Sequence, residues 1–179
     1  VHEECFEGVA ARSISELVNP DYVVIGEASG LNIKTGQRGR AEILLETFGK
    51  AAHSANSEKG VNAVKKMCRL ISELDKLQPP VHEQLGKGIM EVTDIISSPY
   101  PGASVVPEYC RATLDRRLLT GETKESVLAP VKELIARLEK EDPQFSAKAS
   151  FSVGKEKCYT DAEIQGERFF PGWYYDPKE

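Results

Sequence analysis

Two stretches of this sequence place side chains that could take part in metal-dependent chemistry. Glu27 follows an apolar run, Tyr22–Ile25, which is typical of a strand buried on both faces, and the carboxyl ends of such strands commonly carry ligands. His53 stands in Gly-Lys-Ala-Ala-His-Ser-Ala at the end of an alternating strand, where small neighbours leave the imidazole free to project. Taken alone, a strand-end glutamate more often caps a turn, and a loop histidine more often lies on the surface. In this order, however, the two suit a metal site and a lid that closes over it.

The composition excludes several kinds of partner. The chain has 179 residues, of which 40% are hydrophobic and 28% charged, values that are ordinary for a soluble globular protein. Its 23 basic and 28 acidic residues give a net charge of −5, and no basic stripe with interleaved aromatic residues occurs. We therefore expect neither nucleic acid nor a membrane as a partner, and no stretch approaches the roughly 18 apolar residues of a membrane span.

The cysteines and the first residues bear on the compartment and on the extent of the chain. The four cysteines are far apart and form no C-x-x-C pair, which favours reduced thiols in a cytoplasmic protein over a disulfide framework. The chain opens Val-His-Glu-Glu-Cys-Phe, with neither an initiator methionine nor the basic and then apolar pattern of a signal peptide. We expect it to be a fragment of a longer protein.

Hydrophobic periodicity changes character near residue 34. Before it, a short helix at 8–18 and the strand at 22–25 are typical of an α/β sheet. After it, period-two and helical spacings predict a strand at 40–47, a helix at 60–77, strands at 89–96 and 109–119, a helix at 123–141 and a strand at 147–153. The order β-α-β-β-α-β predicts an α+β unit of the ferredoxin-like type, with two helices on one face of a four-stranded antiparallel sheet.

Three further features qualify this fold. Pro130 would cost about 3 kcal/mol in a helix interior, so the second helix either begins near it or is kinked there. Residues 36–40 are rich in glycine, but no Gly-Lys-Ser/Thr follows, and we interpret them as a hinge and the start of a strand. The segment 158–179 is aromatic and has no clear period, so we expect it to need a partner surface.

Four motifs, in this order, resemble the middle of a metallopeptidase and amidohydrolase family that includes acetylornithine deacetylase, succinyl-diaminopimelate desuccinylase, aminoacylase and carboxypeptidase G. The first three are Glu3-Glu4, Val-Ile-Gly-Glu ending at Glu27, and Gly-Lys-Ala-Ala-His ending at His53. The fourth, residues 105–117, is similar to the proline-containing strand and Asp-x-Arg of the family's lid. Together they span nearly all of the chain.

The resemblance implies a domain organisation and partners. Residues 1–33 would be a fragment of a metal-binding catalytic domain, 34–157 an inserted lid and dimerisation domain, and 158–179 a return to the catalytic domain. The parent protein would be a homodimer, joined through an exposed face or edge of the lid sheet. It would hydrolyse an amide or peptide bond in a small substrate that carries a carboxylate.

The resemblance also assigns roles at the catalytic centre. Glu3 would be the general base toward a metal-bound water, Glu4 a metal ligand, and Glu27 a ligand of the second of two divalent metals. Zinc is the default metal, with cobalt or manganese as alternatives. His53 would stabilise the oxyanion, often in the active site of the partner subunit, and would not bind metal.

Asp115 and Arg117 are the predicted substrate-binding residues. They lie two apart on a strand and so share a face, on which the carboxylate can orient the guanidinium, while Arg116 points the other way. The resemblance implies that Arg117 binds the substrate carboxylate. The alternative is that Asp115 and Arg117 form only a surface ion pair, worth under about 1 kcal/mol. Many members of the family carry asparagine three residues before the strand's proline, where this chain has Ser104.

Some of the family's metal ligands are absent from this chain. None of the three histidines is followed by aspartate two residues later, and no histidine occurs after His82. We therefore expect this chain alone to be inactive and not to bind both metals. The alternative function is a non-catalytic ferredoxin-like module for dimerisation or small-molecule binding.

Overall fold

A four-stranded antiparallel sheet is the centre of the structure, a computed structural model that describes residues 9–26, 28–158 and 161–175. Its strands are β2 (Gly39–Phe48), β6 (Ile89–Ser98), β8 (Tyr109–Leu118) and β9 (Ala147–Phe151). β2 pairs with β8 along its whole length, β6 pairs with the other side of β8, and β9 pairs with the other side of β2. The spatial order β9-β2-β8-β6 is that of the predicted ferredoxin-like unit, which is thereby confirmed.

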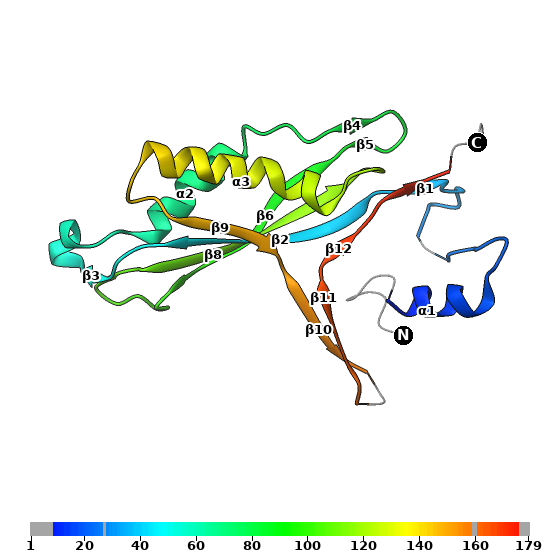
Figure 1. Cartoon of the computed structure of the whole chain (residues 1–179), viewed down its shortest axis with the longest axis horizontal. Helices are drawn as coiled ribbons and strands as arrows, with labels where there is room; N and C mark the ends of the chain where they lie inside the picture. The colour runs from blue at the N-terminus through cyan, green and yellow to red at the C-terminus, as the bar shows by residue number, and fades with distance from the viewer. Residues whose placement is uncertain (1–8, 27, 159–160, 176–179) are drawn as a thin grey trace.

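Two helices, α2 (Ala63–Leu74) and α3 (Lys124–Glu141), lie together on one face of this sheet (Figure 1). Strand β2 alternates buried and partly exposed residues, so that every second side chain faces the helices. The core lies between the two layers and includes Ile43, Leu45, Met67, Leu114 and Leu138. We call the opposite side of the sheet the open face; Arg40 and Glu42 of β2 and Asp115 and Arg117 of β8 lie on it.

Local capping explains where the two helices begin. The Asn62 side chain accepts a hydrogen bond from the Lys65 N–H at the start of α2, and Thr123 and Ser126 form a reciprocal capping box at the start of α3. Helix α3 therefore begins six residues before Pro130 and includes it, so the helix does not start at this proline. Helix α1 (Val9–Val18) forms as predicted.

The aromatic segment returns to the lid. After β9, strands β10 (Val153–Lys157) and β11 (Glu163–Glu167) form a two-stranded ribbon that leaves the sheet on the side away from the helices (Figure 1). Then β12 (Phe169–Phe170) pairs with β2, and β13 (Trp173–Tyr174) pairs with β1 (Gly36–Gln37). β12 is a short fifth strand that no sequence period had indicated. A Cβ at Gly39 would lie only 2.3 Å from the Phe170 carbonyl oxygen, so this close approach requires glycine.

The remaining elements are short. They are β3 (Ala52–His53), the 3₁₀ helix η1 (Ser54–Lys59), β4 (Val81–His82), β5 (Gly86–Lys87) and β7 (Val105–Val106). β3 pairs with β7, and β4 pairs with β5. No helix in the described ranges has both the length and the apolar composition to cross a bilayer.

The predicted buried strand at Tyr22–Ile25 is wrong for this chain. These four residues form no strand, and their side chains are between 66% and 96% exposed. An extended apolar segment becomes a strand only when a neighbour satisfies its backbone N–H and C=O groups. The described residues pair with no part of this segment, so its hydrophobic pattern remains without a partner sheet.

Candidate functional site

His53 lies at one end of the lid, on the short bridge between β3 and β7. His53 is opposite Val105 in this pair, and the Ser54 N–H donates to the Ser104 carbonyl oxygen at 2.9 Å. The ring is at the surface, and its Nδ1 accepts the backbone N–H of Ala55 at 3.1 Å. Because Nδ1 is an acceptor, a neutral imidazole here carries its proton on Nε2 and presents a hydrogen-bond donor. This geometry suits a group that stabilises an oxyanion.

Ser104, the position where many family members carry asparagine, lies directly beside this bridge. Its φ angle is +54°, in the left-handed region that asparagine and glycine favour over other residues. The backbone at Ser104 therefore keeps a conformation suited to asparagine, although the side chain differs. Ser104 therefore lies next to His53, for which a substrate contact is predicted.

Asp115 and Arg117 lie on the open face at the other end of the lid. The Arg117 Nε donates to Asp115 Oδ1 at 2.9 Å, so the carboxylate does orient the guanidinium. Arg116 points to the helix side, where it donates to the Ile89 carbonyl oxygen and to Glu122, both as expected from strand alternation. Burial lowers the pKa of Arg116, and Glu122 opposes that change. Arg116 is thus a structural residue, and Arg117 is the one available to a ligand.

Three residues that sequence reasoning did not assign to the site surround this pair. Arg40 donates from Nε to Asp115 Oδ2 at 3.3 Å and from Nη2 to Glu42, and Arg168 donates to Glu42 Oε1 at 3.0 Å. We call Arg40, Glu42, Asp115, Arg117 and Arg168 the open-face cluster. The alternation along β2, which was visible in the sequence, already places Arg40 and Glu42 on its outward side. The register that sets these two residues opposite β8 was not visible in the sequence.

The two ends of the candidate site are far apart within one chain. Arg117 is opposite Arg40 at one end of β2, and Tyr109 is opposite Phe48 at the other end. Eight residues separate Tyr109 from Arg117, which corresponds to about 26 Å along the strand. His53 belongs to β3, which pairs with β7 and lies beyond the end of β8 that is away from β12 (Figure 1). The structure therefore does not bring the predicted histidine and arginine together.

The predicted acidic residues lie outside the described residues. Glu3, Glu4 and Glu27 fall in residues 1–8 and 27, so their roles stay predictions. Within the described ranges, no group of three or more His, Cys, Asp or Glu side chains is placed to hold a metal ion.

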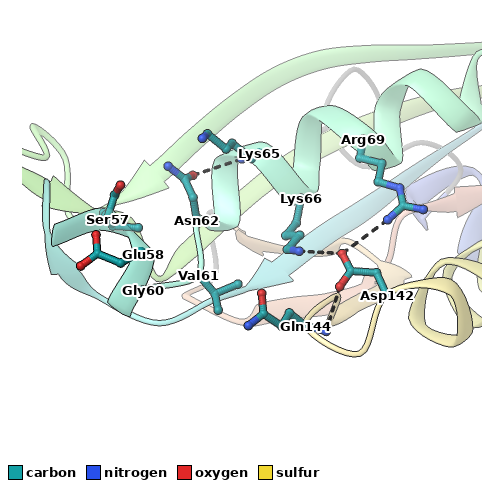
Figure 2. A pocket seen from close by; sticks show the side chains of 11 residues that line it. Ser57, Glu58, Gly60, Val61, Asn62, Lys65, Lys66, Arg69, Asp142 and Gln144 are labelled. Atoms are coloured by element: carbon teal, nitrogen blue, oxygen red, sulfur yellow. Dashed lines mark hydrogen bonds and ion pairs between the residues drawn. The ribbon is translucent and has the colours of Figure 1, made fainter.

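A cleft of about 370 Å³ lies at the start of α2 (Figure 2). Lys66 and Arg69 both point into it, but the Asp142 carboxylate accepts from Lys66 Nζ at 2.7 Å and from Arg69 Nη1 at 3.4 Å. The Lys66 hydrogen bond, together with the Gln144 backbone N–H, lowers the pKa of Asp142. None of the predicted site residues lines this cleft, and two of its cations, Lys66 and Arg69, are already paired with Asp142. We do not assign it to the site.

Comparison with known proteins places this fold in a family. A model of the peptidase dimerisation domain matches residues 35–143. The chain belongs to the peptidase dimerisation domain family. The resemblance seen in the motifs is thereby confirmed.

Relatives of this peptidase dimerisation domain are longer proteins. The chain is 32% identical over 177 residues to the uncharacterised protein YgeY of Escherichia coli strain K12, a match that covers 97% of the chain and 42% of YgeY. It is 26% identical over 154 residues to a succinyl-diaminopimelate desuccinylase of Zymomonas mobilis, covering 80% of the chain and 40% of that enzyme. The chain therefore spans about two fifths of the curated relatives it matches.

Solved structures agree on the fold. A tripeptidase from Staphylococcus aureus superposes with a TM-score of 0.61 at 17% identity, over 99% of this chain and 42% of the tripeptidase. At this level of identity the likeness concerns the fold alone.

Proposed function

We propose that this chain is the lid and dimerisation part of a metal-dependent hydrolase that cleaves an amide or peptide bond in a small, carboxylate-bearing substrate. The observation that carries the proposal is the match of residues 35–143 to the peptidase dimerisation domain. The names of relatives, a succinyl-diaminopimelate desuccinylase and acetylornithine deacetylases among them, support this reaction class. The chain alone would be inactive.

The separation of His53 and Arg117 supports a site shared between two protomers. A small acylated amino acid or dipeptide is much shorter than the roughly 26 Å between the two ends of β8. We therefore propose that each active site takes Arg117 from one protomer and His53 from its partner. Arg117 would bind the substrate carboxylate, and the Nε2–H of His53 would donate to the developing oxyanion.

The catalytic half of the site would come from residues outside the described lid. Glu3 would accept the proton of the attacking water, and Glu4 and Glu27 would be ligands of two divalent metals, zinc by default or cobalt or manganese. When bound, such metals lower the pKa of a water and polarise the scissile carbonyl. Between residues 14 and 33, nine large apolar side chains, Tyr22 and Ile25 among them, are well exposed, which supports packing against a further part of the parent protein.

The free edge of β6 is the surface that we propose for the homodimer contact. Among the described strands β6 pairs only with β8, so its outer N–H and C=O groups face no other strand. Ile89, Ile95 and Ile96 are exposed along it, and a cleft of about 270 Å³ runs between β6 and the end of α2 at Leu74. An edge of this kind readily pairs with a second copy.

Subunit complementation in the full-length protein tests the proposal. The unmodified protein should hydrolyse N-acyl amino acids or dipeptides, lose activity on dialysis against a chelator and regain it with zinc, cobalt or manganese. His53→Ala and Arg117→Ala should each be nearly inactive. When the two are unfolded and refolded together, about a quarter of the activity should return, because half of the dimers are mixed and each has one intact site.

Two outcomes would contradict the proposal. No metal-dependent hydrolysis by the full-length protein would favour the non-catalytic module. Activity of the separate variants but none gained on mixing would place His53 and Arg117 outside a shared site.

A cytoplasmic location is also proposed, on the absence of a disulfide pattern among the cysteines, and fractionation of cells with an antibody to the lid would test it.

A further inference from the structure

The pairing of β2 with β8 sets like charges directly opposite each other on the open face. Arg40 faces Arg117, and the adjacent outward pair sets Glu42 against Asp115. Like charges in directly opposite positions destabilise a sheet, so this arrangement needs compensation from other contacts. The pattern is therefore not explained by the stability of the two strands alone.

Arg40 supplies the compensation because it bridges both carboxylates. It donates from Nε to Asp115 Oδ2 at 3.3 Å and from Nη2 to Glu42. Asp115 thus lies between two guanidinium groups, Arg40 on Oδ2 and Arg117 on Oδ1 at 2.9 Å. Without Arg40, Asp115 and Glu42 would face each other with no cation between them, and the Asp115 carboxylate would lose one of the two contacts that fix its plane.

Glu42, at the far end of the open-face cluster, is also held by Arg168, independently of Asp115. Arg168 donates to Glu42 Oε1 at 3.0 Å, and its carbonyl oxygen accepts the Glu42 N–H at 3.0 Å, at the base of the β10–β11 ribbon. Arg168 makes no contact with Asp115. Removing Arg168 therefore takes a contact from Glu42 and none from Asp115, so a variant of Arg168 is a matched control for a variant of Arg40.

Arg117 is the member of the cluster that a ligand can reach. Arg117 is the most exposed member, with 46% of its side chain accessible, and its terminal nitrogens contact no other described residue. Because Nε is held by Asp115, the planar end of the guanidinium remains available for two parallel hydrogen bonds to one carboxylate.

We propose that Arg40 is a positioning residue: by holding Asp115 it fixes the orientation in which Arg117 binds a single carboxylate group. The inference rests on the role of Arg117 in the proposed function, and it adds Arg40, Glu42 and Asp115 as the scaffold that sets the geometry. The ligand class is a small molecule with one carboxylate at the recognised end, since Arg117 presents one planar guanidinium end to solvent.

Side-chain NMR of the isotope-labelled 179-residue chain tests this without turnover. The signal to follow is the Arg117 Nε–H, which should exchange slowly with water because Asp115 accepts its hydrogen bond. Arg40→Ala should speed this exchange about tenfold, the order expected for weakening a charged hydrogen bond. Arg168→Ala, which also removes one positive charge, should leave it unchanged, and Asp115→Ala should abolish the protection.

The ligand part of the inference uses N-acetylglycine as the probe and N-acetylglycinamide as its uncharged counterpart. N-acetylglycine should shift the terminal guanidinium signals of Arg117, N-acetylglycinamide should not, and Arg40→Ala should weaken the response about tenfold. Arg40→Lys keeps the charge but lacks the planar fork that donates from Nε to Asp115 and from Nη2 to Glu42, so it should resemble Arg40→Ala. Circular dichroism checks that each variant is folded; if Arg40→Ala is not, Arg40→Lys carries the test.

Unchanged Arg117 exchange in the Arg40 variants would overturn the inference, as would an equal effect of Arg168→Ala or equal binding of the amide. These results are independent of catalysis. A protected, Arg40-dependent Arg117 in a protein without hydrolase activity would overturn the proposed function and leave the positioning role intact.

Discussion

At the scale of single residues, a ring contact separates a histidine that is structural from one that is available to a ligand. Both His53 and His82 accept backbone N–H groups at Nδ1, from Ala55 in one case and from Gln84 and Leu85 in the other. The His82 ring also packs edge-on against Tyr174, 5.3 Å between centroids, and so helps to hold the β4–β5 turn against β13. His53 has no such ring contact among the described residues, and its Nε2 remains available to a ligand.

Ionisation of Tyr109 should lower the free energy of unfolding of the lid at alkaline pH. Burial, and then a 2.8 Å hydrogen bond to Glu46, raises the pKa of Tyr109 to about 12. The folded state thus retains the phenol proton above the unfolded pKa of about 10, so this contribution is complete below about pH 10 and is lost as the pH rises toward 12. Tyr109→Phe should flatten the fall in unfolding free energy between about pH 10 and 12, measured by denaturant titration. An identical fall in both proteins would contradict this.

Ser104 offers a test of backbone strain beside His53. Its positive φ disfavours serine relative to asparagine. Ser104→Asn should raise the free energy of unfolding by about 0.5 kcal/mol, while Ser104→Ala, equally disfavoured in this region, should bring no gain. Urea unfolding of the three proteins decides the matter. A gain for alanine as large as that for asparagine would show that strain is not the cause.

At the scale of elements, capping and tertiary packing outweigh one unfavourable residue in α3. The capping box at Thr123 starts the helix, and Val127, Val131, Leu134 and Leu138 bury its inner face against the sheet. Each buried aliphatic side chain contributes about 1.5–3 kcal/mol, which together exceeds the cost of about 3 kcal/mol for Pro130. The helix therefore runs through the proline.

Replacing Pro130 should stabilise the lid. Alanine restores the backbone N–H that can donate to the Ser126 carbonyl, but it also gives the unfolded chain more freedom. The net expectation for Pro130→Ala is a gain of about 1–2 kcal/mol in the free energy of unfolding. Lys132→Ala, at an exposed position of the same helix, should change it by less than about 0.5 kcal/mol. Loss of stability in Pro130→Ala would mean that the proline ring contributes packing that alanine cannot replace.

At the scale of the whole molecule, the lid has one charged face, one helix-covered face and two sheet edges, those of β6 and β9, that no other described strand pairs. The helix surface is crossed by ion pairs between α2 and α3, among them Arg137 with Glu73 and Arg69 with Glu141. The open face holds the arginine cluster. The apolar edge of β6 is therefore the described surface most suited to a second copy, because association there buries hydrocarbon and pairs free backbone groups.

A charge on the β6 edge should dissociate the proposed homodimer. Ile95 is 49% exposed on β6, and Val153, on the ribbon away from that edge, is 50% exposed. Ile95→Lys should convert the protein to a monomer by light scattering, whereas Val153→Lys should remain a dimer. If Ile95→Lys remained a dimer and Val153→Lys became a monomer, the dimer contact would lie on the ribbon and not on the β6 edge.

Much of the lid could be predicted from local patterns. The alternation in 40–47 and the helical spacing in 123–141 reappear as β2 and α3, because each pattern states which side chains must be buried. Tyr22–Ile25 shows the limit of the same reasoning: its apolar run describes burial that needs a partner strand, and the described chain supplies none. β12 was missed for the opposite reason, since two residues have no period. The domain boundaries and the roles of Glu3, Glu4 and Glu27 stay predictions.

The sequence by itself determined the order of the lid's elements, the family motifs, and the shared face of Asp115 and Arg117, because these depend on neighbours within a few residues. Only the tertiary structure decided that Arg40 bridges Asp115 and Glu42, and that His53 and Arg117 lie at opposite ends of the sheet. Both facts follow from the antiparallel register of β2 with β8. A shift of that register by one residue would turn every side chain to the other face, and only packing of the whole core selects among registers.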